Sequence, residues 1–358
     1  MAARFRHVGA VLLVLLLAAC GWPGGSSFGW PGSAARAAEV RDAAGRTVVV
    51  PAHVERVFPA GPPAGLVLFS LVPERLLGWT MKPSAPALAY LGPGADKPAL
   101  GWVAGRGGDA NLEAVLRAKP DLIVDIGMTS GTYVSLAERV QQATGIPVLL
   151  LDGRLVALPA TYRALGRALG VAAEGDERAA WIETHLRTVA QRLETVPDAD
   201  RPKVYLARGT TGLESARAGA INVEAVDAAG GRNVVGEALG AGSLVTVSME
   251  QLLAFDPDVI VALDPGFFAR MKADPLWRQL RAVKTGKAVL APQLPFPWVD
   301  YPPSVNRVIG VVWLAQLLHP AVMRINVRAA AKDFYRLFYH HDLTDAQLDS
   351  LLTDASFP

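Results

Sequence analysis

Arginine, aromatic and hydroxyl side chains stand where this chain could bind a small molecule. They lie in loops that follow segments predicted to be strands, or around a proline-rich loop near the C-terminus. The candidates are Trp102, Arg106, Thr129, Ser130, Arg208, Phe267, Trp298, Tyr301 and Arg307. Guanidinium groups bind carboxylates or oxyanions through paired hydrogen bonds, and Trp and Tyr rings offer flat faces to organic rings. Each candidate could instead be an ordinary surface or packing residue.

The histidines and the single thiol favour neither catalysis nor a bare metal site. His53, His185 and His319 are far apart in the sequence, and we expect His340 and His341 on a helix, where neighbours point to different faces. A zinc or manganese site needs convergent histidines and carboxylates. The chain has no His-Glu-x-x-His motif. We therefore predict no catalytic residue, no cofactor and no metal site.

Cys20, the only cysteine, ends a short export-like segment. Residues 4–7 are basic, residues 8–17 are apolar, and Leu-Ala-Ala-Cys follows. This order is typical of a bacterial signal peptide, and the apolar run is shorter than the ~20 residues of a spanning helix. The last four residues resemble the lipobox of bacterial lipoproteins, which implies cleavage before Cys20 and acylation of its sulfur. The alternative is an ordinary secretory signal in which Cys20 is incidental.

The residues after the signal indicate a tether and an uncharged mature protein. Residues 21–38 begin with a run rich in Gly, Pro and Ser, which predicts a flexible tether. Removal of residues 1–20 takes two arginines from the 35 basic residues and leaves 33, equal to the 33 acidic ones. A neutral chain has no basic field that would favour nucleic acid.

Alternating apolar strands and helical segments predict an α/β fold. The predicted strands are short, continuous apolar runs, as in parallel sheets covered on both faces. They cover residues 122–124, 148–151, 204–207, 259–263 and 288–290, and the helical segments between them cover residues 112–118, 133–143, 223–229 and 249–254.

An internal repeat predicts two similar lobes. Residues 111–127 match residues 248–264, with Glu113 opposite Glu250 and a Pro-Asp turn before each strand. Each copy starts with a residue that can cap a helix and then enters a buried strand.

One long helix is predicted between the lobes. Gly170 can end the preceding helix, Asp176 can cap the long one, and Pro197 can stop it. The resulting organisation is a signal peptide (1–20), a tether (21–38), an N-terminal lobe (39–157), linker helices (158–197), a C-terminal lobe (198–327) and a helical tail (328–358).

These segments resemble the helical-backbone class of bacterial solute-binding proteins, which serve ABC importers of siderophores, haem, vitamin B12 and some metal oxyanions. The resemblance rests on a predicted hairpin at residues 40–51, on residues 53–59, and on the repeated segments around the long helix. It implies two Rossmann-like lobes with parallel sheets, joined by a long rigid helix, with the ligand in the cleft between them.

The resemblance also implies partners. In that class a glutamate at the places of Glu113 and Glu250 docks onto arginines of the permease. The alternative is that both are ordinary helix-start carboxylates favoured by the helix dipole. We expect a monomer that works with an ABC permease dimer and its ATPase subunits, and that is held to a membrane by its lipid.

Three C-terminal segments, residues 297–307, 311–320 and 333–344, look like the branch described as iron-complex binding, which includes molybdate and tungstate binders. We therefore predict an exported, lipid-anchored receptor for a ferric chelate of the siderophore or haem type. A molybdate, tungstate or cobalamin binder of the same class is the alternative. From another class, a chelatase-like enzyme or a ligand sensor stays open.

Overall fold

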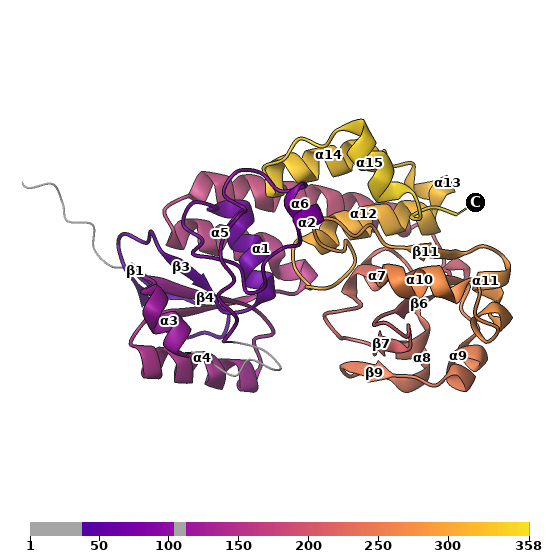
Figure 1. The fold of residues 1–358 in the computed structure, drawn as a ribbon, viewed down its shortest axis with the longest axis horizontal. Helices are drawn as coiled ribbons and strands as arrows, with labels where there is room; N and C mark the ends of the chain where they lie inside the picture. Colours follow the sequence, from indigo (N-terminus) through magenta and orange to yellow (C-terminus); the bar gives the residue numbers. More distant parts are fainter. Residues whose placement is uncertain (1–37, 104–111, 358) are drawn as a thin grey trace, which may run out of the picture. The chain divides into compact units, whose positions relative to one another are not determined.

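The computed structural model describes residues 38–103 and 112–357, and these residues belong to one compact unit. Within them, two parallel sheets are each surrounded by helices (Figure 1). Strands from every predicted apolar run are present, and most of their side chains are buried. The predicted α/β fold, with two parallel-sheet lobes and a long connecting helix, is confirmed.

The first lobe is built on the parallel sheet β3-β4-β5. Its strands are β3 (Val57–Pro59), β4 (Leu122–Gly127) and β5 (Val148–Asp152), and its helices are α1 (Pro62–Leu71), α2 (Ala85–Leu88), α3 (Leu112–Ala118) and α4 (Gly131–Thr144). The predicted N-terminal hairpin is the antiparallel pair β1 (Ala38–Arg41) and β2 (Thr47–Val50). Five of the six residues of β4 are buried, as expected for a central strand covered on both faces.

The second lobe is built on the parallel sheet β11-β10-β6-β8 and carries a small antiparallel pair, β7-β9. Its strands are β6 (Lys203–Ala207), β7 (Glu214–Ala216), β8 (Arg232–Asn233), β9 (Leu244–Thr246), β10 (Val259–Ala262) and β11 (Ala288–Leu290). Its helices are α7 (Glu224–Ala228), α8 (Val234–Leu239), α9 (Met249–Phe255), α10 (Pro265–Met271) and α11 (Arg281–Lys284).

The repeated segments have the same backbone in both lobes. Lys119 after α3 and Asp256 after α9 both adopt the left-handed conformation, with φ of 46° and 44°. Two residues after each of these positions, an aspartate accepts backbone hydrogen bonds from the start of the neighbouring strand or from the segment before it. Asp121 accepts hydrogen bonds from Glu55 N and Arg56 N at 2.9 Å, and Asp258 accepts one from Lys203 N at 2.8 Å. The repeat is therefore a structural one.

The long helix is α6 (Ala172–Leu193), which packs antiparallel to α5 (Leu158–Ala168). Its 22 residues span roughly 33 Å at 1.5 Å each. The expectation that Asp176 caps it is wrong, because the helix begins four residues earlier. Gly166 and Gly175 let α5 and α6 approach closely, since a Cβ on Gly175 would lie 2.7 Å from Tyr162 O. Asp176 lies inside the helix and pairs with Arg163 at 3.3 Å.

The C-terminal helices cover the linker and return to the first lobe. They are α12 (Asn306–Leu318), α13 (Pro320–Met323), α14 (Val327–Phe338) and α15 (Asp345–Leu352), of which α14 and α15 lie over α6 and α12 in Figure 1. Gly92 N donates to Tyr339 O at 2.8 Å. The expectation that His340 and His341 lie on a helix is wrong, because α14 ends at Phe338 and His340 has a φ of 53°.

Candidate ligand-binding cleft

A cleft of about 580 Å³ lies between the two lobes. From the first lobe it is lined by Gly61 and the first turns of α1, by the segment around Trp79 and Met81, by Trp102, and by the end of β4 with Tyr133. From the second lobe side it is lined by Arg208, by Ile221 and Asn222, and by the proline-rich loop around Phe296. Strands β4 and β6 both point their carboxyl ends at this space, which is where open α/β sheets bind ligands.

Most of the cleft wall is apolar and aromatic. Trp79, Trp102, Tyr133, Phe296 and Tyr301 contribute rings. Seven prolines also line it, and their rings cannot donate a backbone hydrogen bond: Pro62, Pro63, Pro83, Pro295, Pro297, Pro302 and Pro303. Such a surface suits a bulky organic ligand better than a small hydrated ion.

A larger hollow of about 960 Å³ lies on the second lobe, beside α10, α11 and the C-terminal residues. Lys272, Arg278 and Lys284 line it together with Asp354 and Phe357. It lies away from the carboxyl ends of β4 and β6, so we place the ligand in the inter-lobe cleft.

Three of the sequence-predicted residues line this cleft, namely Trp102, Arg208 and Tyr301. Trp102 is half-buried, whereas Tyr301 is 61% exposed. Arg106 lies outside the described residues. Thr129 and Ser130 follow the lining residue Met128 but are not part of the wall, and Ser130 is the exposed N-cap residue of α4.

Phe267 and Trp298 lie in the protein interior and not on the cleft. Phe267 is 3% exposed, and its ring centroid lies 4.6 Å from that of Trp277 in the core of the second lobe. Trp298 is fully buried and donates from Nε1 to Tyr335 Oη at 3.0 Å. Burial of their large apolar rings gives both residues a packing role.

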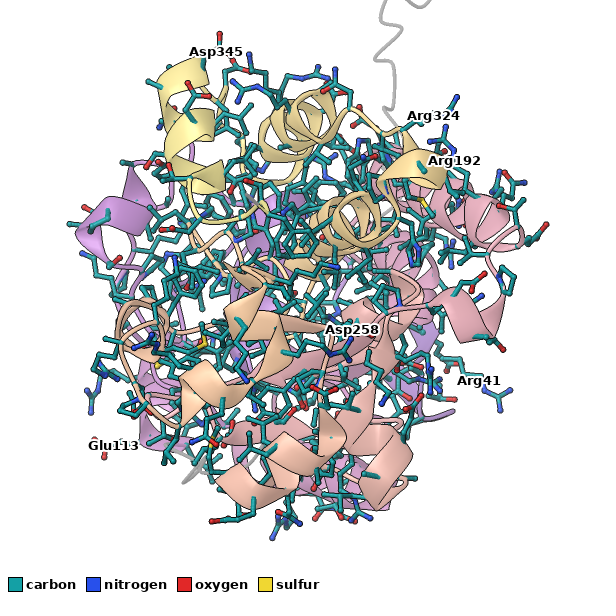
Figure 2. The ribbon with its side chains drawn as sticks, turned by 90° about the vertical axis from the view of Figure 1, so that its right-hand side faces the viewer. Arg41, Glu113, Arg192, Asp258, Arg324 and Asp345 are labelled. Atoms are coloured by element: carbon teal, nitrogen blue, oxygen red, sulfur yellow. The ribbon has the colours of Figure 1, made fainter. Side chains whose placement is uncertain are left out.

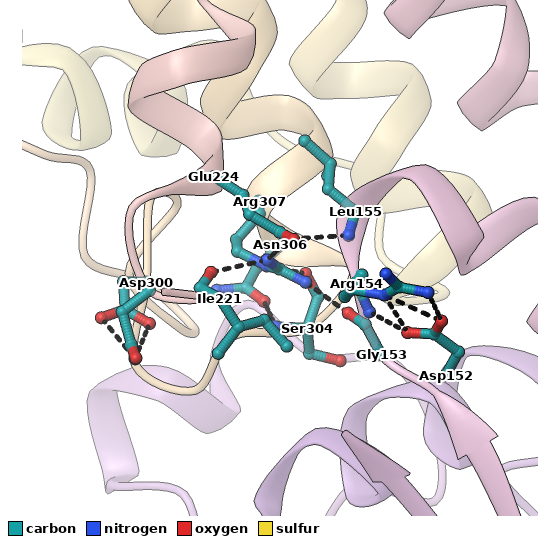
Figure 3. A network of polar contacts seen from close by, with 11 residues as sticks. Asp152, Gly153, Arg154, Leu155, Ile221, Glu224, Asp300, Ser304, Asn306 and Arg307 are labelled. Atoms are coloured by element: carbon teal, nitrogen blue, oxygen red, sulfur yellow. Dashed lines mark hydrogen bonds and ion pairs between the residues drawn. The ribbon is translucent and has the colours of Figure 1, made fainter. Parts of the chain in front are cut away.

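Arg307 is also interior, where it joins the two lobes (Figure 3). Its Nη2 donates to Gly153 O, which follows β5 of the first lobe, at 2.6 Å. Its Nη1 donates to Ile221 O at 2.8 Å and to Glu224 Oε2 at 2.6 Å, both in the second lobe. Glu224 also accepts from Leu155 N at 2.8 Å. Burial lowers the pKa of Arg307, and the nearby Glu224 carboxylate opposes this effect.

Arg208 reaches the cleft with its charge already balanced. Its Nη1 lies 2.5 Å from Glu214 Oε1, and its Nε lies 2.9 Å from Asp300 Oδ2. Asn222 Nδ2 donates to both carboxylate oxygens of Asp300, at 3.0 and 3.1 Å. Burial raises the pKa of Asp300, and Arg208 counteracts that shift. An anionic ligand group would therefore compete with two carboxylates for this guanidinium.

Comparison with known proteins agrees with this architecture. Residues 85–294, more than half of the chain, match the periplasmic binding protein family model. The chain belongs to the periplasmic binding protein family. This confirms the family that the repeated segments predicted.

Individual relatives of this binding protein cover different shares of it. A cobalamin-binding protein of Halobacterium salinarum is 30% identical over 201 residues, which are 52% of this chain and 50% of the relative. The chain thus spans about half the length of the curated relatives it matches. An ABC transporter solute binding protein from Sulfurospirillum deleyianum is 27% identical, with a TM-score of 0.79 over 88% of this chain and 99% of the other.

A third neighbour supports the fold alone. The molybdate periplasmic binding protein of Haemophilus influenzae is 19% identical, with a TM-score of 0.70 over 86% of this chain and 99% of the other.

Glu113 and Glu250 stand on the outside of this binding protein. Glu113 has a side chain that is 82% exposed and pairs with Arg117 at 2.6 Å. Glu250 is exposed, and a hydrogen bond with Ser248 lowers its pKa. Neither lines the cleft. Helices α3 and α9 both lie in the lower half of Figure 1, α3 at the left and α9 at the right, and Figure 2 shows Glu113 near the lower edge and Asp345 of α15 at the top.

Two further properties concern only residues 38–103 and 112–357. Over these ranges, there is no group of three or more His, Cys, Asp or Glu side chains that could hold a metal ion. Over the same ranges, no helix combines the length and the apolar character needed to cross a membrane.

Sequence reasoning missed several lining residues, including Asp125, Tyr133 and Phe296. Asp125 carried a readable signal, since it is the one charged residue within the buried strand β4. Tyr133 and Phe296 carried none, because an aromatic residue in a helix or a proline-rich loop is more often a core residue. Cleft-facing and core-facing rings become distinguishable only once the lobes are assembled.

Proposed function

We propose that this protein is the extracytoplasmic receptor of an ABC importer and that it captures an organic metal chelate. A ferric chelate is the first candidate ligand. The supporting observation is the wall of the inter-lobe cleft, where aromatic rings and prolines predominate and Arg208 is engaged by Glu214 and Asp300. Rings of this kind pack against the flat organic surface of a chelate. A permease with its ATPase subunits would be the partner.

A corrinoid is the second candidate, and the 30% identity to a cobalamin-binding protein over 201 residues favours it. A corrinoid offers a large ring system bearing uncharged amides, which would suit an apolar wall with few free charges. A molybdate or tungstate ion has less support, because an oxyanion needs several convergent donors, and the described wall offers few that are free.

The predicted lipid anchor and docking sites complete the proposal. Acylation of Cys20 would hold the receptor at a membrane, and residues 21–38 would serve as its tether. Glu113 and Glu250, both exposed and both at helix starts, would meet basic residues of the permease.

Native mass spectrometry of the protein purified from its own periplasm or membrane fraction tests this function. The expected result is a one-to-one complex whose added mass contains an organic ligand and a metal. Co-purification of a bare oxyanion, or turnover of a chelate into a metal-free product, would contradict the proposal.

A further inference from the structure

Asp125 differs from the other charged residues of the cleft wall in lacking a charged partner. It lies in β4, is 5% exposed, and lines the cleft beside Ile126 and Gly127. Lys82, in contrast, lies 2.7 Å from Asp96, and Arg208 pairs with Glu214 and Asp300. Among the described side chains, none forms an ion pair with Asp125, and its hydrogen-bonding neighbour is the backbone amide of Ile126.

Arg46, the cation that acts on the pKa of Asp125, forms its ion pair with Asp42. Arg46, in the turn between β1 and β2, bonds Asp42 Oδ2 through Nε at 2.9 Å and through Nη2 at 2.6 Å. The same Nη2 donates to Val148 O at 2.9 Å. Burial raises the pKa of Asp125 to about 6, while the Ile126 amide and Arg46 act in the opposite direction. The carboxyl is therefore mostly ionised at neutral pH and lacks a cation of its own.

A buried carboxylate without a partner is costly, and proteins keep such groups mainly where a ligand completes them. The polar side chains that share the cleft wall with Asp125 include the Tyr133 hydroxyl, the Asn222 amide, Lys82 and Arg208. Since both cations already have acidic partners, Asp125 is the one charged lining residue of the described wall that forms no ion pair.

We propose that Asp125 determines ligand specificity: it accepts a hydrogen bond from an amide or ammonium N–H group of a chelate whose net charge is zero or positive, and it disfavours anionic chelates. This inference rests on the proposed function. Rejection by an unpaired like charge is a general means of discrimination between otherwise similar ligands.

The test compares four probes on the full-length chain by calorimetry at pH 7.5. Ferrioxamine B carries an ammonium group, cyanocobalamin is neutral and rich in amides, and a ferric tris-catecholate and haemin are anionic. The wild type is expected to bind the best neutral or cationic probe at least about ten-fold more tightly than either anionic probe. Asp125→Asn should reduce that ratio by about ten-fold or more, as expected for loss of a charge-assisted contact.

Asp227→Asn is the matched control. Asp227 is an exposed aspartate on α7 and does not line the cleft. Asp227→Asn should leave the ratio unchanged. At pH 5 the wild type should lose part of its preference, whereas Asp125→Asn should show no such pH dependence.

Three results would overturn the inference. A wild type that prefers an anionic probe, or an Asp125→Asn variant that is folded by circular dichroism and keeps the wild-type ratio, would show that Asp125 does not select the ligand while leaving the proposed function intact. Binding of none of the four probes by the wild type would overturn the proposed function and this inference with it.

Discussion

Arg307 Nη1 lies 2.6 Å from Glu224 Oε2 at the place where the two lobes meet. Both partners also bond the backbone of the first lobe, Arg307 at Gly153 O and Glu224 at Leu155 N. The ion pair therefore fixes one lobe against the other beneath the cleft. Together with the 22-residue helix α6, it restricts how far the lobes can separate.

Arg307→Met should destabilise the protein strongly. The substitution removes four hydrogen bonds and leaves Glu224 without its cation, and breaking a buried pair from one side costs about 3–5 kcal/mol. Urea denaturation measures the change. Arg281→Met is the control, since Arg281 is half-exposed beside Asp256 and Asp258 and should cost at most about 1 kcal/mol. Equal losses in the two variants would contradict the role given to Arg307.

The core of the fold was predictable from sequence because burial leaves a local pattern. Residues 122–124 of β4 and residues 259–262 of β10 are continuously apolar, and Pro120 and Pro257 follow the same left-handed turn in both copies. The start of α6 was not predictable from Asp176. The helix begins where Gly166 and Gly175 allow two helices to touch, which is a tertiary contact.

The candidate site was predictable only in part. Arg208 and Trp102 lie where loops after strands were expected to bind ligand. Trp298 and Arg307 lie in or near the proline-rich loop in sequence, yet their side chains are buried in the interior. A polar side chain can satisfy either a ligand or the backbone of a neighbouring lobe, and sequence spacing does not distinguish the two.

Asp125→Asn should stabilise the protein at neutral pH. A carboxyl whose pKa rises from 3.8 to about 6 on folding holds its proton more tightly in the folded state, so stability falls as pH increases through this window. Removing the charge should raise the free energy of unfolding by about 2–3 kcal/mol at pH 7.5 and by little at pH 4. Urea titrations at both pH values measure this. A variant less stable than wild type at pH 7.5 would show that Asp125 is paired in solution.

Cys20→Ser should release the protein from the membrane fraction or leave its signal uncut, because the proposed site of acylation is its sulfur. Labelling with an alkyne fatty acid and fractionation of cells expressing either form are the measurements. Ser26→Ala in the tether is the control and should keep the label. A wild type that takes up no label would contradict the anchor.

Glu113→Arg combined with Glu250→Arg should abolish uptake and spare ligand affinity. Both side chains are exposed and neither lines the cleft, so the reversal sets like charges against the permease without touching the ligand. Uptake of labelled chelate by cells and calorimetry on the purified protein are measured together. Glu194→Arg combined with Asp345→Arg, two exposed residues elsewhere, is the control and should transport normally. Normal transport by the first pair, or its loss of ligand binding, would make the repeat a folding feature only.

The central claim is that the aromatic inter-lobe cleft binds an organic metal chelate, and calorimetric titration of paired variants tests it most directly. Trp102→Ala should weaken binding of the tightest chelate by about ten-fold or more, because the substitution removes the indole ring against which the organic part of the chelate would pack. Leu276→Ala, at a 53%-exposed apolar residue outside the cleft, should bind as wild type does. Sodium molybdate should give no saturable heat with any of these proteins. Stoichiometric binding of molybdate, or chelate affinity that Trp102→Ala leaves unchanged, would contradict the account.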